Sequence, residues 1–305
     1  MWFKNLVVFR LPSDWSLSPI ELEEQLARRV LQPCGPLEMS SRGWVSPGPS
    51  GRLVHTVGVQ QLIALGVDQK LLPASIIRQV AKERAEALAA EQGHPVSRRQ
   101  MRELKLRVTE ELRARALSRR RVTRAWIDPQ GGWFVVDAAG AARAEEVVET
   151  LRATLGGFAA QPLETQRSPQ SCMGTWLRAG DAPDRFRIDQ DLELQAADRS
   201  RATIRYTRHP LDGKQIQSHL QAGLCATRLG LTWSDRISFV LTDKLHVKRV
   251  EFLDVRRESA ADEEVDPSEQ FDTEFALMAG ELSRLLTDLA AALGGESRRP
   301  EAAAA

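Results

Sequence analysis

The residues of this chain that can do chemistry are cations concentrated in one segment, residues 97–124. The segment holds eleven Lys or Arg residues against three glutamates, a formal +8, whereas the whole chain carries only +1. Met101, Leu104, Val108 and Leu112 recur at spacings of three and four, which predicts one apolar stripe of a helix. Because that stripe can pack while the neighbouring side presents cations to solvent, we expect a polyanion as the partner.

The candidate ligands for a polyanion are the bases beside this stripe and those that follow the helix. They are Arg98, Arg102, Lys105, Arg113, Arg119, Arg120, Arg121 and Arg124. The run 119–121 places three like charges side by side, directly before an apolar strand rather than in a tail. Since such charges repel one another, the run predicts a counter-charge supplied from outside the protein. A solvated basic face without a partner is the alternative interpretation.

A second group of bases falls on predicted strands of the second half. Arg201 and Arg205 alternate with apolar residues, and Lys244, His246 and Lys248 do the same. In an antiparallel sheet this alternation indicates one packed face and one solvated basic face. Residues 254–281, by contrast, hold ten acids and two arginines, a net −8. Opposite fields on different surfaces would steer a polyanion to one surface and away from the other.

Two other functions stay open on the residues alone. A metal-dependent nuclease would need carboxylates for Mg²⁺, and the candidates are Asp262, Glu263, Glu264 and Asp266. Their place ahead of a helix favours a solvated loop instead. A protein-interaction scaffold without DNA binding would use the acidic segment to bind a basic partner. The five histidines have no HxxxH or HExxH spacing, and the sequence has no P-loop, GxSxG or Rossmann fingerprint. We therefore expect no enzyme, no catalytic residue, no metal and no cofactor.

The elements that would position these bases belong to an α+β fold with largely antiparallel sheets. Strands are predicted over residues 2–11, 52–67, 122–128 and 132–138, with helices over 18–30 and 141–155. Residues 73–117 predict two antiparallel helices that project as a finger. A helix over 169–179, several strands between 185 and 255, and a long helix from Ser268 to about Leu293 complete the second half.

At 305 residues the chain is long enough for two or three domains. We predict a central α+β domain from residues 1–72 and 118–160, a helical finger at 73–117, and a base α+β domain at 161–305. No run of 18 apolar residues is present, so no membrane span is expected, and the N-terminus lacks the pattern of a signal peptide. Cys34, Cys172 and Cys225 are isolated thiols. These features predict a cytoplasmic protein.

Several segments are similar to the RdgC family, recombination-associated proteins of proteobacteria, along essentially the whole chain. They are WFKNLVVFRL (2–11), QPCGPLEM (32–39), GWVSP (43–47), LLPASIIRQ (71–79), ALSR (116–119), WID (126–128), AGLCATRLGLTW (222–233) and EQFDTEFALMAGEL (269–282). The resemblance implies a nucleoid-associated protein without catalytic activity that binds double-stranded DNA with little sequence preference. It also implies a ring-shaped homodimer around the duplex, and restraint of the RecA recombinase through competition for DNA.

The resemblance also implies roles for single positions. In the family a hydrophobic residue, often aromatic, stands at the finger tip before a Ser-Arg pair and closes the ring. Leu117, which precedes Ser118 and Arg119, takes that place as the dimer gate. A basic-polar pair of the second half corresponds to Arg208 and His209. The position of a family lysine is occupied here by a leucine, Leu224, so Arg228 nearby is the expected replacement.

Overall fold

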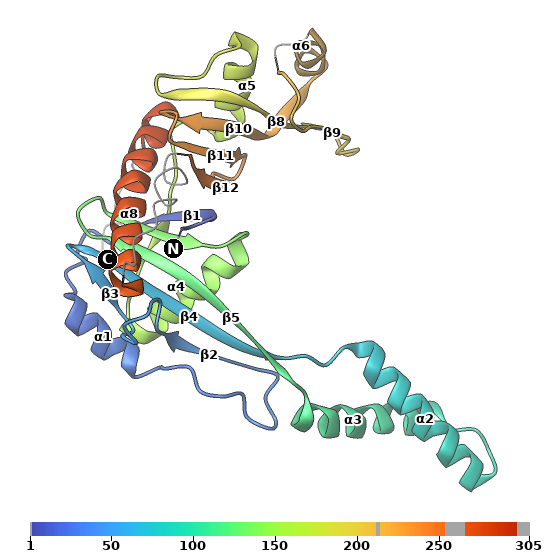
Figure 1. Cartoon of the computed structure of the whole chain (residues 1–305). Helices are drawn as coiled ribbons and strands as arrows, with labels where there is room; N and C mark the ends of the chain where they lie inside the picture. Colours follow the sequence, from blue (N-terminus) through green and yellow to red (C-terminus); the bar gives the residue numbers. More distant parts are fainter. Residues whose placement is uncertain (1, 212–213, 254–265, 298–305) are drawn as a thin grey trace, which may run out of the picture.

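The structure of the chain is a computed structural model that describes residues 2–211, 214–253 and 266–297 (Figure 1). A large sheet of antiparallel strand pairs runs through it in the order β2-β4-β5-β6-β1-β12-β11-β10-β8-β9. Strand β1 (Asn5–Arg10) joins the two halves, because it pairs with β6 (Trp133–Asp137) on one side and with β12 (Val247–Phe252) on the other. The expected α+β fold with antiparallel strands is confirmed.

The N-terminal half of the sheet has two apolar faces, because alternate residues of a strand point to opposite sides. Its other strands are β2 (Ser40–Val45), β3 (His55–Val57), β4 (Gln60–Lys70) and β5 (Ser118–Asp128). Ile127 packs in a core with α1 (Pro19–Ala27) and α4 (Ala141–Leu155). Trp126 belongs to a second core, which includes α8 (Pro267–Ala292). Burial on both faces fixes the register of β5, and with it the direction in which the strand leaves the sheet.

The C-terminal half of the sheet consists of β12 and four further strands. These are β8 (Phe186–Ala196), β9 (Thr203–Tyr206), β10 (Leu224–Trp233) and β11 (Ile237–Thr242). Helices α5 (Pro169–Ala179) and α6 (Lys214–Gln221) contribute Met173 and Ile216 to its core. The same core contains the apolar side of α8, which Figure 1 shows running alongside both halves of the sheet.

Two helices leave the sheet between β4 and β5 and project well beyond it (Figure 1). Helix α2 (Ala74–Gln92) ends at Gly93, whose φ of 72° suits the left-handed cap that stops a helix. Helix α3 (Arg98–Arg115) begins with a capping box between Ser97 and Gln100. Because β4 and β5 remain paired up to Lys70 and Ser118, the projection grows from two long strands. The predicted helical finger is confirmed.

One predicted basic face of the second half is wrong. Strand β12 begins only at Val247, because residues 243–246 form the turn after β11, where the Thr242 N–H donates to the His246 carbonyl (3.0 Å). Lys244 and His246 therefore lie in the turn and do not share a strand face with Lys248. The alternation of residue types continues through the turn, but the backbone pairing does not.

Other elements differ less from the prediction. The helices over 141–155 and 169–179 have the expected bounds, whereas β2, the short β7 (Gln161–Pro162) and α6 were not predicted. The sheet is continuous through β1, so it passes across both predicted α+β domains. The division into domains at residues 72, 117 and 160 stays a prediction.

Candidate nucleic-acid interface

Helix α3 presents unpaired cations on one side because its other side is packed. Val108 is fully buried against α2, where the small buried residues Ala81 and Ala85 allow the two helices to approach closely. Arg84 of α2 adds a bidentate ion pair to Glu111 of α3. The exposed bases of α3 that have no ion pair or side-chain hydrogen bond within the described part of the chain include the predicted Arg98, Arg102 and Lys105, and also Arg107.

Arg113 lies at the base of the projection and is already engaged. Its Nη1 donates to the Leu37 carbonyl at 3.0 Å, which ties α3 to the loop before β2. Its Nε is buried without a partner among the described residues. A half-buried arginine in this position supports the projection, and only part of its guanidinium faces solvent. It therefore differs from the free bases farther along the helix.

The prediction that the run 119–121 takes its counter-charge from outside is wrong for two of its three members. Arg120 makes a bidentate ion pair with Asp68, its neighbour across β4, with both N···O distances 2.8 Å. Arg121 is paired with Glu146 of α4. Successive strand residues point to opposite faces, so Arg120 points away from the face of Arg119 and Arg121, and the two paired arginines have partners on different sides. Of the three arginines of this run, only Arg119 is exposed and has no ion pair among the described residues.

The carboxyl of Asp68 is held in its charged form. Its side chain is only 9 % exposed, and the hydrogen bonds from Arg120 lower its pKa below the ordinary value, outweighing the effect of burial. The guanidinium of Arg120 is itself 57 % exposed, so one side remains open to solvent. Arg124, the last base of the group, is half-buried and donates from Nε to the Pro47 carbonyl at 3.0 Å.

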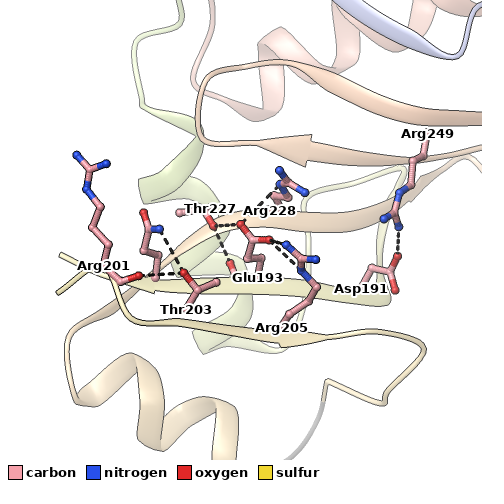
Figure 2. A network of polar contacts seen from close by, with 9 residues as sticks. Asp191, Glu193, Arg201, Thr203, Arg205, Thr227, Arg228 and Arg249 are labelled. Atoms are coloured by element: carbon pink, nitrogen blue, oxygen red, sulfur yellow. Dashed lines mark hydrogen bonds and ion pairs between the residues drawn. The ribbon is translucent and has the colours of Figure 1, made fainter. Parts of the chain in front are cut away.

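The bases of the second half cluster around two carboxylates of β8 (Figure 2). Glu193 lies directly across from Arg205 of β9 and from Arg228 of β10, since it is paired with both in the sheet register. Arg205 Nε donates to Glu193 at 3.0 Å, whereas the Arg228 Nε lies 3.7 Å from the same carboxylate. Glu193 is thus shared by two arginines, and its side chain is only 12 % exposed.

A second carboxylate, Asp191, holds a base that the sequence analysis missed. Arg249 Nη1 donates to Asp191 at 2.8 Å, and the Arg208 backbone N–H donates to the same side chain at 3.1 Å. The missed signal is the spacing of Asp191 and Glu193, two residues apart on one strand, which places both acids on one face. Acids repeated on one face repel one another and favour cations nearby, and Arg249 supplies one to Asp191.

The remaining predicted bases of this half have no ion pair among the described residues, and those around β9 lie at the edge of the sheet. Arg201 precedes β9 with φ of 48°, so it is not part of the strand face expected for it, and Figure 2 shows it pointing away from Glu193. Arg208 is exposed in the loop after β9, and the ring of His209 beside it contacts the Pro210 carbonyl (2.8 Å). Lys248 is half-buried in β12 and has no ion pair within the described part of the chain.

Leu117 lies at the base of the projection and not at its tip, contrary to the expectation. Strand β5 begins at Ser118, directly after Leu117, and the Leu117 carbonyl accepts from the Leu71 N–H (2.8 Å) at the end of β4. The tip is the turn between α2 and α3, around Gly93. Leu117 is nevertheless 80 % exposed and Leu71 beside it 52 %, so an apolar contact surface is present there.

The acids proposed for a nuclease lie mostly beyond the part of the chain that the structure describes. Asp262, Glu263 and Glu264 fall in the gap 254–265, as does the first part of the acidic segment. Asp266 is described, and it caps α8 by accepting from the Ser268 N–H at 3.0 Å. Within residues 2–211, 214–253 and 266–297, no group of His, Cys, Asp or Glu has a geometry that could hold a metal ion. Among the helices of these residues, none has the length and hydropathy needed to cross a bilayer.

Comparison with known proteins identifies the family of this chain. A family model with the description "Putative exonuclease, RdgC" matches residues 1–296. A recombination-associated protein RdgC of Dechloromonas aromatica is 50 % identical over 299 residues, which cover 97 % of this chain and 98 % of that protein. The protein of the same name from Cupriavidus necator is 49 % identical over 298 residues, covering 98 % of this chain and all of its own length. The chain belongs to the RdgC family.

Proposed function

We propose that the protein binds double-stranded DNA without sequence preference and acts in recombination. The observation that carries this proposal is the exposed ridge of α3 beside its packed side, where Arg98, Arg102 and Lys105 have no ion pair among the described residues. These cations are held on a packed helix and receive no counter-charge from the described residues, which favours a polyanion as their ligand. The names of the curated relatives support recombination as the process.

The proposed chemistry is neutralisation of phosphates. Lys and Arg side chains that contact phosphates release the counterions condensed on DNA, so affinity falls steeply with salt and depends little on sequence. The bases of the second half add a separate surface. Its exposed members are Arg201, Arg208 and His209, and Lys248 of β12 is half-buried. His209 adds charge only when it is protonated.

The proposal extends to assembly. A second copy of the chain would complete a ring around the duplex, and the exposed side chain of Leu117 supports an apolar contact at the base of the projection. A closed homodimer on DNA would associate with the nucleoid and would restrain RecA by competing for DNA. A catalytic role forms no part of the proposal, since the function rests on binding and on exclusion.

The experiment that tests this function is a binding series on duplexes of unrelated sequence, with metal ions chelated and the salt concentration varied. We expect equal affinity for the different sequences and a steep fall with salt. A parallel incubation with Mg²⁺, followed by separation of the DNA by length, tests for cleavage. Binding that fails even at low salt would refute the proposal, and shortening of the DNA with Mg²⁺ would replace it with the nuclease that the family description names.

A further inference from the structure

A small cavity lies over the second half of the sheet, lined by residues of β8, β9, β10, β11 and β12 and by Asn5 of β1. Its volume is about 180 Å³. A cavity of this kind needs only about 10–15 Å³ to hold one water molecule, so a polyatomic ion has room. Its charged lining comes from four strands: Arg205, Arg228, Lys248, Arg249, Asp191 and Glu193.

The lining of the cavity has a surplus of positive charge. Four cations face two carboxylates, which leaves a formal +2. The adjoining cavity, of about 770 Å³, provides a comparison within the same protein. Three arginines and three carboxylates line it, so its charges balance. The adjoining cavity on this part of the sheet therefore does not share the surplus of the smaller one.

The carboxylates leave free donors on the arginines that they hold. Arg205 uses Nε and Nη2 toward Glu193, so its Nη1 is not engaged. Arg249 uses only Nη1 toward Asp191, and Arg228 only its Nε, at 3.7 Å from Glu193. Lys248 completes the set with an ammonium group that has no ion pair in the described residues. Guanidinium groups with free parallel N–H donors match the oxygens of a phosphate.

The acids also fix the positions of these donors. Burial alone would raise the pKa of the Glu193 carboxyl, but the hydrogen bond from Arg205 and the charge of Arg228 outweigh it and lower the pKa. Glu193 is therefore a constant anion at neutral pH, with Arg205 and Arg228 on either side (Figure 2). Donors that are held in place before the ligand arrives lose little side-chain entropy on binding.

We propose that this cavity binds a single phosphate group, with Lys248 and Arg228 as its main ligands and with Glu193 and Asp191 as positioning residues. A phosphate monoester or inorganic phosphate carries about −1.5 to −2 at pH 7, close to the surplus of the lining, whereas a backbone phosphodiester carries about −1 and neutralises only half of it. The inference relies on the proposed function only for a source of the phosphate, a DNA backbone or a DNA end. The site itself stands on the cavity and its charges.

The chain offers a direct reporter, because Tyr206 lines the cavity and is the only tyrosine of the sequence. Protein labelled with 3-fluorotyrosine gives one ¹⁹F resonance, which we would follow while adding inorganic phosphate at constant ionic strength, with chloride as the reference anion. We expect a saturable shift with phosphate and none with chloride. Lys248→Ala should raise the Kd at least tenfold, whereas Lys248→Arg should keep binding.

The matched control is Arg187→Ala, which alters the balanced cavity and should leave the phosphate titration unchanged. Far-ultraviolet circular dichroism establishes that each variant is folded. A shift that does not saturate, a shift that chloride reproduces, or equal Kd values for wild type and a folded Lys248→Ala variant would overturn the proposal. None of these results depends on DNA, so they remain distinct from a failure of the duplex to bind.

Two short duplexes of one sequence then identify the source of the phosphate. One carries 5′-phosphates and the other 5′-hydroxyl groups, and fluorescence anisotropy measures the binding of both. Equal perturbation of the Tyr206 resonance by the two would assign the cavity to the backbone. Perturbation by the phosphorylated duplex alone would assign it to an end. If both duplexes bind and neither changes the phosphate titration of the cavity, the phosphate group of DNA is not its ligand and this part of the inference fails.

Discussion

Replacing Arg98, Arg102 and Lys105 with alanine should change the salt dependence of duplex binding by a predictable amount. The three side chains are exposed on α3 and have no ion pair in the described protein, so each is available for one phosphate. For B-DNA each neutralised phosphate contributes about −0.9 to the slope of log K against log salt. Losing three contacts should therefore make the slope shallower by about 2.7, and should weaken binding between about 10²- and 10³-fold at 0.1 M salt.

The assay is fluorescence anisotropy with a labelled duplex at five or more salt concentrations. A control variant with Arg28, Arg29 and Arg143 changed to alanine loses the same charge from exposed positions just after α1 and on α4. We expect the slope of this control to stay within about half a unit of wild type. Its arginines lie away from the proposed contact surface, and salt screens their effect on the bound DNA. Equal slope changes in the two triple variants would refute the assignment of α3 as the contact surface. So would an unchanged slope in the α3 variant.

Three further predictions concern the base and the tip of the projection. Asp68→Asn should cost about 1.5–3 kcal/mol of unfolding free energy at pH 7, because it removes a charged partner of Arg120. Because folding lowers the pKa of Asp68, the wild type should exceed Asp68→Asn in unfolding free energy by the full amount above about pH 4. The gap between the two proteins should vanish as the pH falls further and Asp68 becomes protonated. Denaturant titration at several pH values measures it. Ser97→Ala should cost about 1 kcal/mol and speed amide hydrogen exchange in α3 but not in β5, and equal rates in α3 would contradict the capping role. Leu117→Asp should weaken self-association in sedimentation velocity while leaving the melting temperature within a few degrees, and an unchanged profile would remove Leu117 from the dimer contact.

The sequence predicted the projection well because its signals are local. Periodic apolar residues mark α3, and Gly93 and Ser97 mark the turn before it, so each boundary is set within a few neighbouring residues. The same reasoning failed for Lys244 and His246, because the four-residue turn between β11 and β12 carries a strand-like alternation. Whether such a segment is paired is decided by its partners across the sheet and not by its own sequence.

The candidate site was predicted only as a set of bases. Nothing local to the run 119–121 shows that Asp68 and Glu146, distant along the chain, supply its counter-charges. The partner of Arg249 is likewise distant, at Asp191 of another strand. Tertiary pairing therefore divides the bases into those that the protein neutralises and those that it leaves free, and a count of charges in the sequence cannot make that division.

The measurement that tests encirclement of the duplex most directly compares a covalently closed circular DNA with the same DNA made linear. Protein is bound at low salt with metal chelated, the salt is then raised, and the fraction retained on each DNA is measured. Because a closed ring leaves a circle only by opening, we predict retention on the circle and loss from the linear form. Equal loss from both forms, after binding that was steeply salt-dependent, would contradict encirclement and would leave only a basic surface that binds DNA from one side.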